Sequence, residues 1–144
     1  MTKYIHYGSK IFDIDRFEQI SNFFIKPNGG LWASRVDSEF GWKEWNEDSK
    51  FAECNIDNSF TFTLKSDAKV IELFEDDDLL KLPRFDPTFP TIGNYYLIDY
   101  EECIRQRIDA IEVRDISKGL YWSLYGYGCE CILILNPDIV EVRN

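Results

Sequence analysis

Two residues, one near each end of the chain, combine a reactive side chain with a position suited to chemistry. Glu130 follows the loop "GYGC" and begins the apolar run "CILIL", so its carboxylate lies where a loop enters a buried strand. Such a carboxylate must be paired, solvated or functional, because burying it alone is costly. His6, the only histidine, lies in "KYIHYGSK" and carries one donor and one acceptor nitrogen when neutral. Taken singly, each also fits a structural role, His6 as a satisfied strand residue and Glu130 as an edge charge in water.

Other chemistries have weaker support in the sequence. The chain contains no GxGxxG, no GxxxxGK[ST] and no GxSxG, so neither a phosphate-binding glycine loop nor a serine nucleophile elbow is predicted. The acidic run 76–78 is typical of a helix N-terminus, and Trp42 and Trp45 have the spacing of core aromatics. Because the four cysteines form no CxxC and only one histidine is present, we expect no metal site and free thiols in a reducing compartment.

Composition narrows the class of protein. The 144 residues, 44% of them hydrophobic, suit a single domain over 1–144 with a real core. The net charge of -10 would repel phosphate backbones, which disfavours a dedicated nucleic-acid binder. No apolar run approaches the roughly 20 residues of a membrane span, and the first ten residues lack a signal-peptide core. We therefore expect a cytoplasmic protein without a membrane partner.

Periodicity and turn signals predict the elements that must position these residues. Capping-box pairs Asp15/Glu18 and Asp99/Glu102 predict helices over about 15–23 and 100–107, and Phe60, Phe62 and Leu64 alternate as in a strand. Segments 82–96 and 119–128 are expected to be long connections. The pattern indicates an α+β chain rather than a doubly wound sheet. The remaining expected strands are 3–7, 30–34, 68–74, 109–115, 129–136 and 138–144, and the remaining helices begin at Asp37 or Ser38 and at Glu75.

Three of these segments, taken in order, resemble the signature blocks of a known family. "YIHYGS", "GGLWAS" and "GCECILILNPDIVEV" are similar to the His-Tyr-Glu signature of the ADP-ribosyltransferase fold, in its diphtheria-toxin and poly(ADP-ribose) polymerase branch. "SFTFTLKSDAKVIEL" also resembles the central strand pair of that family. The resemblance implies a split mixed and antiparallel sheet with a few flanking helices, and NAD as co-substrate.

The resemblance also implies roles for individual residues. Glu130 is expected to be catalytic, bonding the nicotinamide ribose and stabilising positive charge as the glycosidic bond breaks. His6 is expected to bond the adenine-side ribose and Trp32 to stack on nicotinamide in place of the signature tyrosine. The expected cofactor-binding set is completed by Tyr7, Gly8, Ser9 and Ser34, and the expected acceptor contacts are Tyr125 and Tyr127.

The chain departs from the family pattern at three positions. Tyr7 stands between the histidine and the glycine, Trp32 replaces tyrosine, and Gly128 stands where arginine-modifying relatives carry Gln or Glu. The leading hypothesis is a mono-ADP-ribosyltransferase with an unknown protein or nucleic-acid acceptor, of a size that suits a toxin-like or phage effector. An NAD glycohydrolase, or an enzyme acting on an RNA 2′-phosphate, is the alternative on the same fold. A non-catalytic acidic inhibitor or interaction protein, suggested by the charge of -10, is the alternative from another class.

Overall fold

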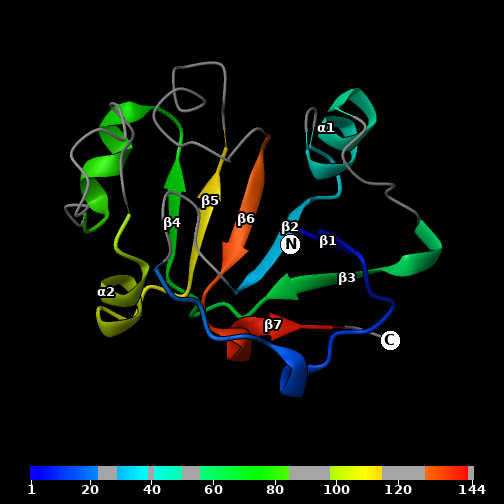
Figure 1. The fold of residues 1–144 in the computed structure, drawn as a ribbon, viewed down its shortest axis with the longest axis horizontal. Coiled ribbons are helices and arrows are strands. Elements are labelled where there is room, and N and C mark those ends of the chain that lie inside the picture. The colour runs from blue at the N-terminus through cyan, green and yellow to red at the C-terminus, as the bar shows by residue number, and fades with distance from the viewer. Residues whose placement is uncertain (23–28, 39–40, 50–55, 85–97, 115–128, 143–144) are drawn as a thin grey trace.

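The centre of the protein is one mixed, strongly curled sheet of seven strands (Figure 1). The computed structural model describes residues 1–22, 29–38, 41–49, 56–84, 98–114 and 129–142. Strands β4 and β5 are parallel, and the other neighbouring pairs are antiparallel. A mixed sheet with few helices confirms the α+β class. In spatial order the strands are β4 (Val70–Leu73), β5 (Ala110–Val113), β6 (Cys131–Ile134), β2 (Leu31–Arg35), β1 (Tyr4–Tyr7), β3 (Ser59–Leu64) and β7 (Val140–Glu141).

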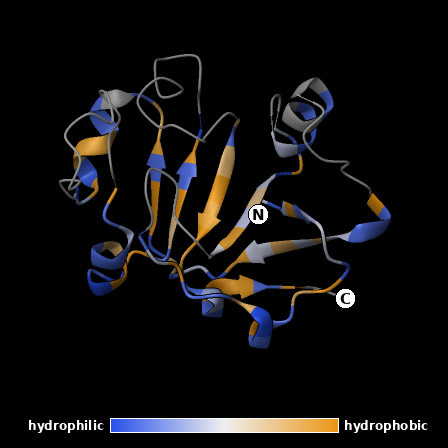
Figure 2. Cartoon of the chain, viewed as in Figure 1, coloured by the Kyte–Doolittle hydropathy of each residue, from blue (hydrophilic) through white to orange (hydrophobic). Residues whose placement is uncertain are grey.

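The strands with the most apolar sequences lie inside the sheet. All four residues of β5 and all four of β6 are buried, as expected for strands covered on both faces. Strand β3 instead alternates at its start, with Phe60 and Phe62 buried and Thr61 exposed between them. Figure 2 shows the hydrophobic colouring concentrated along β4, β5 and β6. The predicted strands at these places are confirmed.

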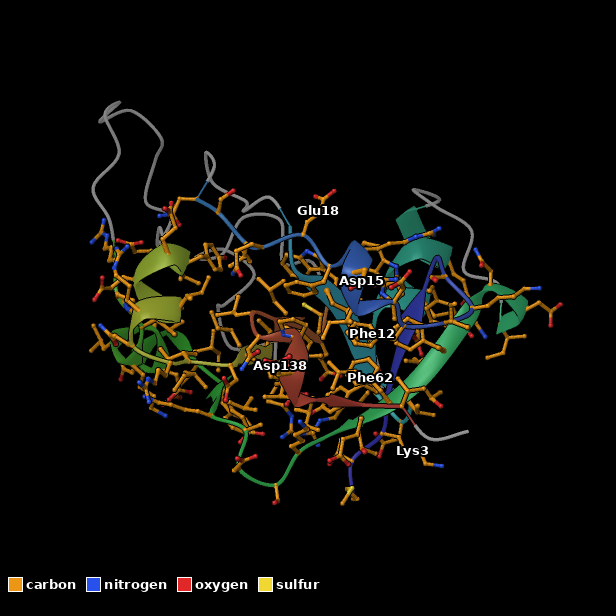
Figure 3. All side chains as sticks on the ribbon, turned by 90° about the horizontal axis from the view of Figure 1, so that it is seen from below. Lys3, Phe12, Asp15, Glu18, Phe62 and Asp138 are labelled. Atoms are coloured by element: carbon orange, nitrogen blue, oxygen red, sulfur yellow. The ribbon has the colours of Figure 1, made fainter. Side chains whose placement is uncertain are left out.

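Two hydrophobic cores lie on opposite faces of the sheet. Along β6, Cys131 and Leu133 belong to the first core, whereas Ile132 and Ile134 belong to the second. The second core continues through Tyr4, Ala33, Phe60 and Phe62, and includes half-buried Phe12 and Phe17. Figure 3 shows Phe12 and Phe62 directed inward, while Glu18 lies at the outer margin. The first core also contains Ile20, Leu73, Leu79, Leu82, Ile98, Tyr100, Cys103, Ile108, Ile111, Val113, Cys129 and Leu135.

The helices are short and flank the sheet. Helix α2 (Tyr100–Arg105) begins as predicted, because the Asp99 carboxylate accepts a hydrogen bond from the Glu102 amide at 3.0 Å. Helix α1 (Trp42–Ser49) begins later than predicted; its Trp42 amide donates to Ser34 Oγ at 2.8 Å. The expected helix at Glu75 is a 3₁₀ helix, η3 (Asp76–Lys81). Further 3₁₀ turns are η1 (Ile14–Arg16), η2 (Ile56–Asn58) and η4 (Pro137–Ile139), the last occupying the start of the expected final strand.

The predicted helix over 15–23 is wrong in the residues that the structure describes. Asp13, not Asp15, is the capping residue, and regular structure stops at Arg16 because Phe17 has an extended backbone. The Glu18 carbonyl accepts a hydrogen bond from the Gly30 amide at 2.9 Å instead of closing a helical turn. Phe17 packs on the second core and Ile20 on the first, so this segment must run extended across the edge between the two faces.

Candidate functional site

The three segments that resemble the family signature include three consecutive strands of the sheet. Strand β1 carries His6, its neighbour β2 carries Trp32, and Glu130 immediately precedes β6, the other neighbour of β2. Because Ile5 pairs with Ser34 and Ala33 pairs with Ile132, the register brings the ends of the chain together at β2. Segments distant in the sequence are therefore adjacent in the fold.

The His6 ring is held by a backbone carbonyl. Its Nδ1 lies 2.6 Å from the carbonyl oxygen of Trp32, and its ring centroid is 5.2 Å from that of Phe60. Since a carbonyl oxygen only accepts, Nδ1 carries the proton, and in the neutral ring Nε2 is then an acceptor. Burial lowers the pKa of His6, while the hydrogen bond to Trp32 acts in the opposite direction. At neutral pH the ring therefore presents a lone pair rather than a charge.

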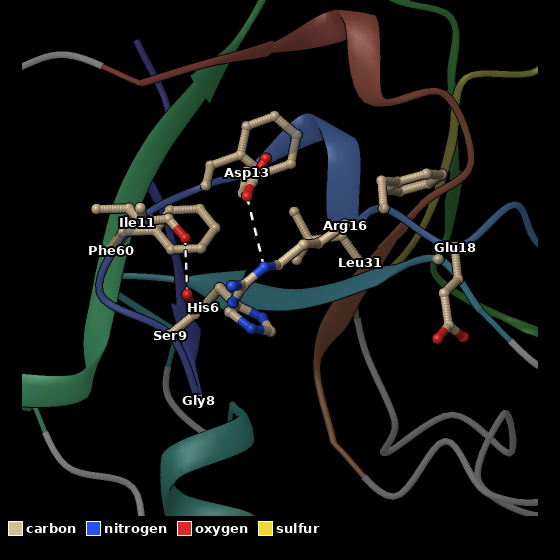
Figure 4. A pocket seen from close by; sticks show the side chains of 12 residues that line it. His6, Gly8, Ser9, Ile11, Asp13, Arg16, Glu18, Leu31 and Phe60 are labelled. Atoms are coloured by element: carbon tan, nitrogen blue, oxygen red, sulfur yellow. Dashed lines mark hydrogen bonds and ion pairs between the residues drawn. The ribbon is translucent and has the colours of Figure 1, made fainter.

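His6 lines a cavity of about 340 Å³, the first cavity (Figure 4). Gly8 and Ser9, both expected at the site, line the same cavity, and the Ser9 hydroxyl donates to the Ile11 carbonyl at 2.7 Å. Arg16 brings a cation, which is paired with Asp13 at 3.5 Å and is otherwise largely exposed. The cavity thus combines aromatic walls, polar groups, the Arg16 cation and the two carboxylates of Asp13 and Glu18. Its other lining residues are Ile11, Phe12, Phe17, Glu18, Gly30, Leu31 and Phe60.

Trp32 contributes its backbone, but not its indole, to the surroundings of His6. Its half-buried side chain packs on the first core, whereas the next residue, Ala33, belongs to the second. His6 shares the face of the second core, because it contacts Phe60 and lies two residues from Tyr4. The indole and the imidazole therefore leave the sheet on opposite faces. Tyr7, which is also half-buried, follows His6 on β1, so its side chain lies on the face opposite to that of His6.

Glu130 and Ser34 meet at the start of β6. Ser34 Oγ donates to the Glu130 carbonyl oxygen at 2.9 Å and accepts the Trp42 amide at 2.8 Å. This buried hydroxyl therefore joins β2, the entry to β6 and the start of α1. Half-buried Glu130 lines a second cavity of about 190 Å³, distinct from that of His6. The other residues lining the second cavity are Arg35, Asp37, Ser38, Glu112, Val113, Arg114 and Cys131.

A charged network across four strands lies beside this second cavity. Arg35 bonds Glu112 twice, through Nε at 2.8 Å and Nη2 at 3.1 Å, and reaches Glu72 at 3.3 Å. Arg114 donates to the same Glu72 oxygen at 2.8 Å, and the Tyr4 hydroxyl donates to Glu112 at 3.1 Å. Burial and the Glu112 carboxylate raise the pKa of Tyr4, so its proton stays in place. We define these five residues as the charged network.

Sequence reasoning did not anticipate several of these residues. The expected acceptor contacts Tyr125 and Tyr127 lie outside the described residues. Arg16, Asp13 and the buried Glu112 were missed, because each is unremarkable in its local sequence. Only Glu112 could have been recognised from the sequence, because it is a single carboxylate inside the apolar run "AIEV". Such a charge must be paired.

No family model, curated protein or solved structure matches this chain. Within the described ranges, no group of three or more His, Cys, Asp or Glu side chains is placed to hold a metal ion. Among those same residues, no helix has the length and apolar character needed to cross a membrane.

Proposed function

We propose that the protein is an NAD-dependent mono-ADP-ribosyltransferase that uses Glu130 as its catalytic residue. The observation that supports it most is the order of strands β1, β2 and β6, which makes neighbours of the three segments resembling the His-Tyr-Glu signature.

The state of His6 suits binding of a ribose. Its Nδ1 is engaged by the Trp32 carbonyl, so Nε2 is left as an acceptor at the first cavity. A ribose hydroxyl donates to such a nitrogen at no cost in charge, because the lowered pKa keeps the ring neutral. The aromatic walls Phe12 and Phe60 add stacking area. In this proposal the adenosine half of NAD occupies the first cavity.

The separation of the two cavities suits a dinucleotide. His6 lies on β1 and Glu130 at the entry to β6, two strands away in the sheet, which is about 10 Å at the usual strand spacing. NAD contains two riboses joined by a diphosphate, so one ribose can lie at His6 and the other at Glu130. Arg16, at the first cavity, is a cation suited to the diphosphate, and its ion pair with Asp13, at 3.5 Å, is an exposed one that a diphosphate would have to replace.

The reaction requires a carboxylate beside the breaking bond. The bond between nicotinamide and the ribose C1′ breaks with its electron pair leaving on nicotinamide, which makes C1′ electron-deficient. A fixed carboxylate at Glu130 stabilises that developing positive charge. The acceptor nucleophile then bonds to C1′ and loses its proton to solvent. Ser34 holds the backbone of Glu130 through the bond to its carbonyl oxygen.

Incubation with labelled NAD and a lysate or nucleic-acid pool tests the proposal. Wild-type protein is expected to release nicotinamide and label a macromolecule. The variant Glu130→Gln, nearly identical in shape, is expected to lose at least about a hundredfold in rate while still binding NAD in calorimetry. Glu47→Gln, the same change on the exposed side of α1, serves as the matched control.

Undiminished nicotinamide release by Glu130→Gln would rule the proposal out. Release of free ADP-ribose without labelled macromolecule would instead indicate the hydrolase alternative. Absence of both NAD binding and thermal stabilisation by NAD would favour the acidic interaction protein.

One observation bears on the RNA 2′-phosphate alternative, which needs basic residues around the site. Arg35 and Arg114 are distant in the sequence but line the same cavity as Glu130. Both guanidinium groups, however, are already paired with carboxylates, Arg35 with Glu112 and Arg114 with Glu72. A phosphate would have to compete with these ion pairs, so the transferase remains the better supported function.

A further inference from the structure

We propose that Arg35 and Arg114 are positioning residues that hold the Glu130 carboxylate ionised and oriented from both sides. Only the catalytic consequence of this inference depends on the proposed function. The electrostatic relationship itself is a property of the folded chain and can be measured without NAD.

The register of the sheet places Glu130 between the two arginines. Ala33–Ile132 is the last pair of β2 with β6, and continuing that register by two residues brings Arg35 opposite Glu130, which immediately precedes β6. On the other side of β6, Val113–Cys131 is the last pair with β5, and continuing that register by one residue brings Arg114 opposite Glu130, each just outside its strand. Side chains directly opposite on neighbouring strands lie on the same face, with Cβ atoms about 5 Å apart. All three residues line the second cavity.

The two guanidinium groups are themselves held in place. Glu112, with 3% of its side chain exposed, fixes Arg35 through two hydrogen bonds and is itself fixed by the Tyr4 hydroxyl. A single Glu72 oxygen accepts from both Arg35 and Arg114. The charged network therefore sets the separation of the two cations across β6.

Such a network is better explained by positioning than by stability. Buried ion pairs often contribute little net stability, since the cost of removing the charges from water offsets their attraction. Here Arg35 and Arg114 share the second cavity with a further carboxylate, that of Glu130. Glu112 and Asp37 also line the second cavity, and both carboxylates repel Glu130. In this proposal Arg35 and Arg114 offset that repulsion and that of Glu72, the third carboxylate nearby, and so favour the ionised form of Glu130.

The test follows the Glu130 carboxylate directly. Protein labelled with ¹³C-glutamate is titrated by NMR, and Glu130→Gln identifies the Glu130 resonance by its loss. Arg114→Gln is expected to move the midpoint of that titration upward by roughly one pH unit, because an opposite charge is removed. Arg35→Gln should act in the same direction. Arg114→Lys, which keeps the charge, should restore most of the wild-type midpoint.

The controls separate positioning from folding. Arg105→Gln makes the same change at the exposed Arg105–Glu102 pair of α2 and should leave the Glu130 midpoint unchanged. Arg114→Gln leaves the buried Arg35–Glu112 pair intact, so it provides a folded variant if Arg35→Gln does not fold. An unchanged midpoint in folded Arg114→Gln overturns the inference.

The same variants distinguish this inference from the proposed function. If wild-type protein cleaves NAD, Arg114→Gln should lower kcat about tenfold and change the KM for NAD less than about twofold, since it acts on the transition state. If wild-type protein does not cleave NAD but the midpoint shifts, the transferase proposal fails and the positioning of Glu130 stands. If wild type and Arg114→Gln have equal kcat and the same Glu130 midpoint, the positioning role is rejected and the transferase proposal stands.

Discussion

The imidazole of His6 is anchored to the backbone of Trp32 by a contact of 2.6 Å between Nδ1 and the carbonyl oxygen. This bond joins the two neighbouring strands β1 and β2 through a side chain. Because Nδ1 holds the proton of this bond, Nε2 is the nitrogen of the neutral ring that carries a lone pair. The position of Trp32 therefore matters to His6 through its main chain, and not through its indole.

The first prediction concerns the protonation of His6. ¹⁵N NMR of the single histidine should show a proton on Nδ1 and none on Nε2 at pH 7.5. The ring should titrate below the ordinary midpoint of about 6.5, because burial lowers the pKa. A proton on Nε2, or a midpoint above the ordinary value, would contradict the geometry.

A second prediction follows for stability against pH. Because the pKa of His6 is lower in the folded chain, the unfolded chain binds more protons in the window just below about pH 6.5, and stability falls with falling pH. His6→Asn keeps a donor near the Trp32 carbonyl but cannot titrate. Urea unfolding at pH 7.5 and 5.0 should show a smaller loss for His6→Asn than for wild type. Equal losses in the two proteins would remove this role for His6.

The third prediction concerns the Arg35–Glu112 pair. Arg35→Met leaves the carboxylate of Glu112, only 3% exposed, without its cation, and should lower the free energy of unfolding by about 3 kcal/mol. The double variant Arg35→Met/Glu112→Leu should recover most of that loss, because no buried charge is then left unpaired. Denaturant titration measures both. A double variant no more stable than the single one would contradict this prediction.

The fourth prediction concerns the close approach at Gly29. A Cβ there would lie 2.7 Å from the Gln19 carbonyl oxygen, at a φ of +83° that side chains rarely adopt. Gly29→Ala should therefore cost about 2 to 3 kcal/mol of unfolding free energy. Gly8→Ala, with φ +118° but its nearest atom at 3.7 Å, isolates the backbone contribution and should cost less. Equal costs would show that the contact at Gly29 relaxes freely.

The fifth prediction concerns the end of α2. Arg107 has a φ of +60°, and the amide of Ile108 donates to the Cys103 carbonyl at 2.9 Å, which is the Schellman arrangement. Glycine adopts this conformation without strain, so Arg107→Gly should raise the free energy of unfolding by about 1 kcal/mol. Arg107→Ala, which keeps the strain, is the control and should give no such gain. Loss of stability in Arg107→Gly would indicate that the arginine side chain contributes contacts of its own.

The elements predicted correctly from the sequence are those with strong local signals. Helix α2 carries its own cap at Asp99, and β3 carries an alternation of aromatic and polar residues. The helix expected from Asp15 and Glu18 failed because the same spacing of apolar residues also fits a segment that serves both cores. Phe17 and Ile20 are drawn to opposite faces, and Gly29–Gly30 allow the backbone to approach closely. Local periodicity does not distinguish these two outcomes.

By itself, the sequence determined the α+β class, the main strands, the place of His6 on a strand and that of Glu130 at the entry to one, because alternation, capping and turn chemistry act over a few residues. Only the tertiary structure decided what those side chains meet. The bond from His6 to Trp32, the turn of the Trp32 indole to the other face, and the flanking of Glu130 by Arg35 and Arg114 all depend on register between distant segments. Register is chosen by which faces of the whole sheet become buried, and a shift of one residue would reverse every one of these orientations.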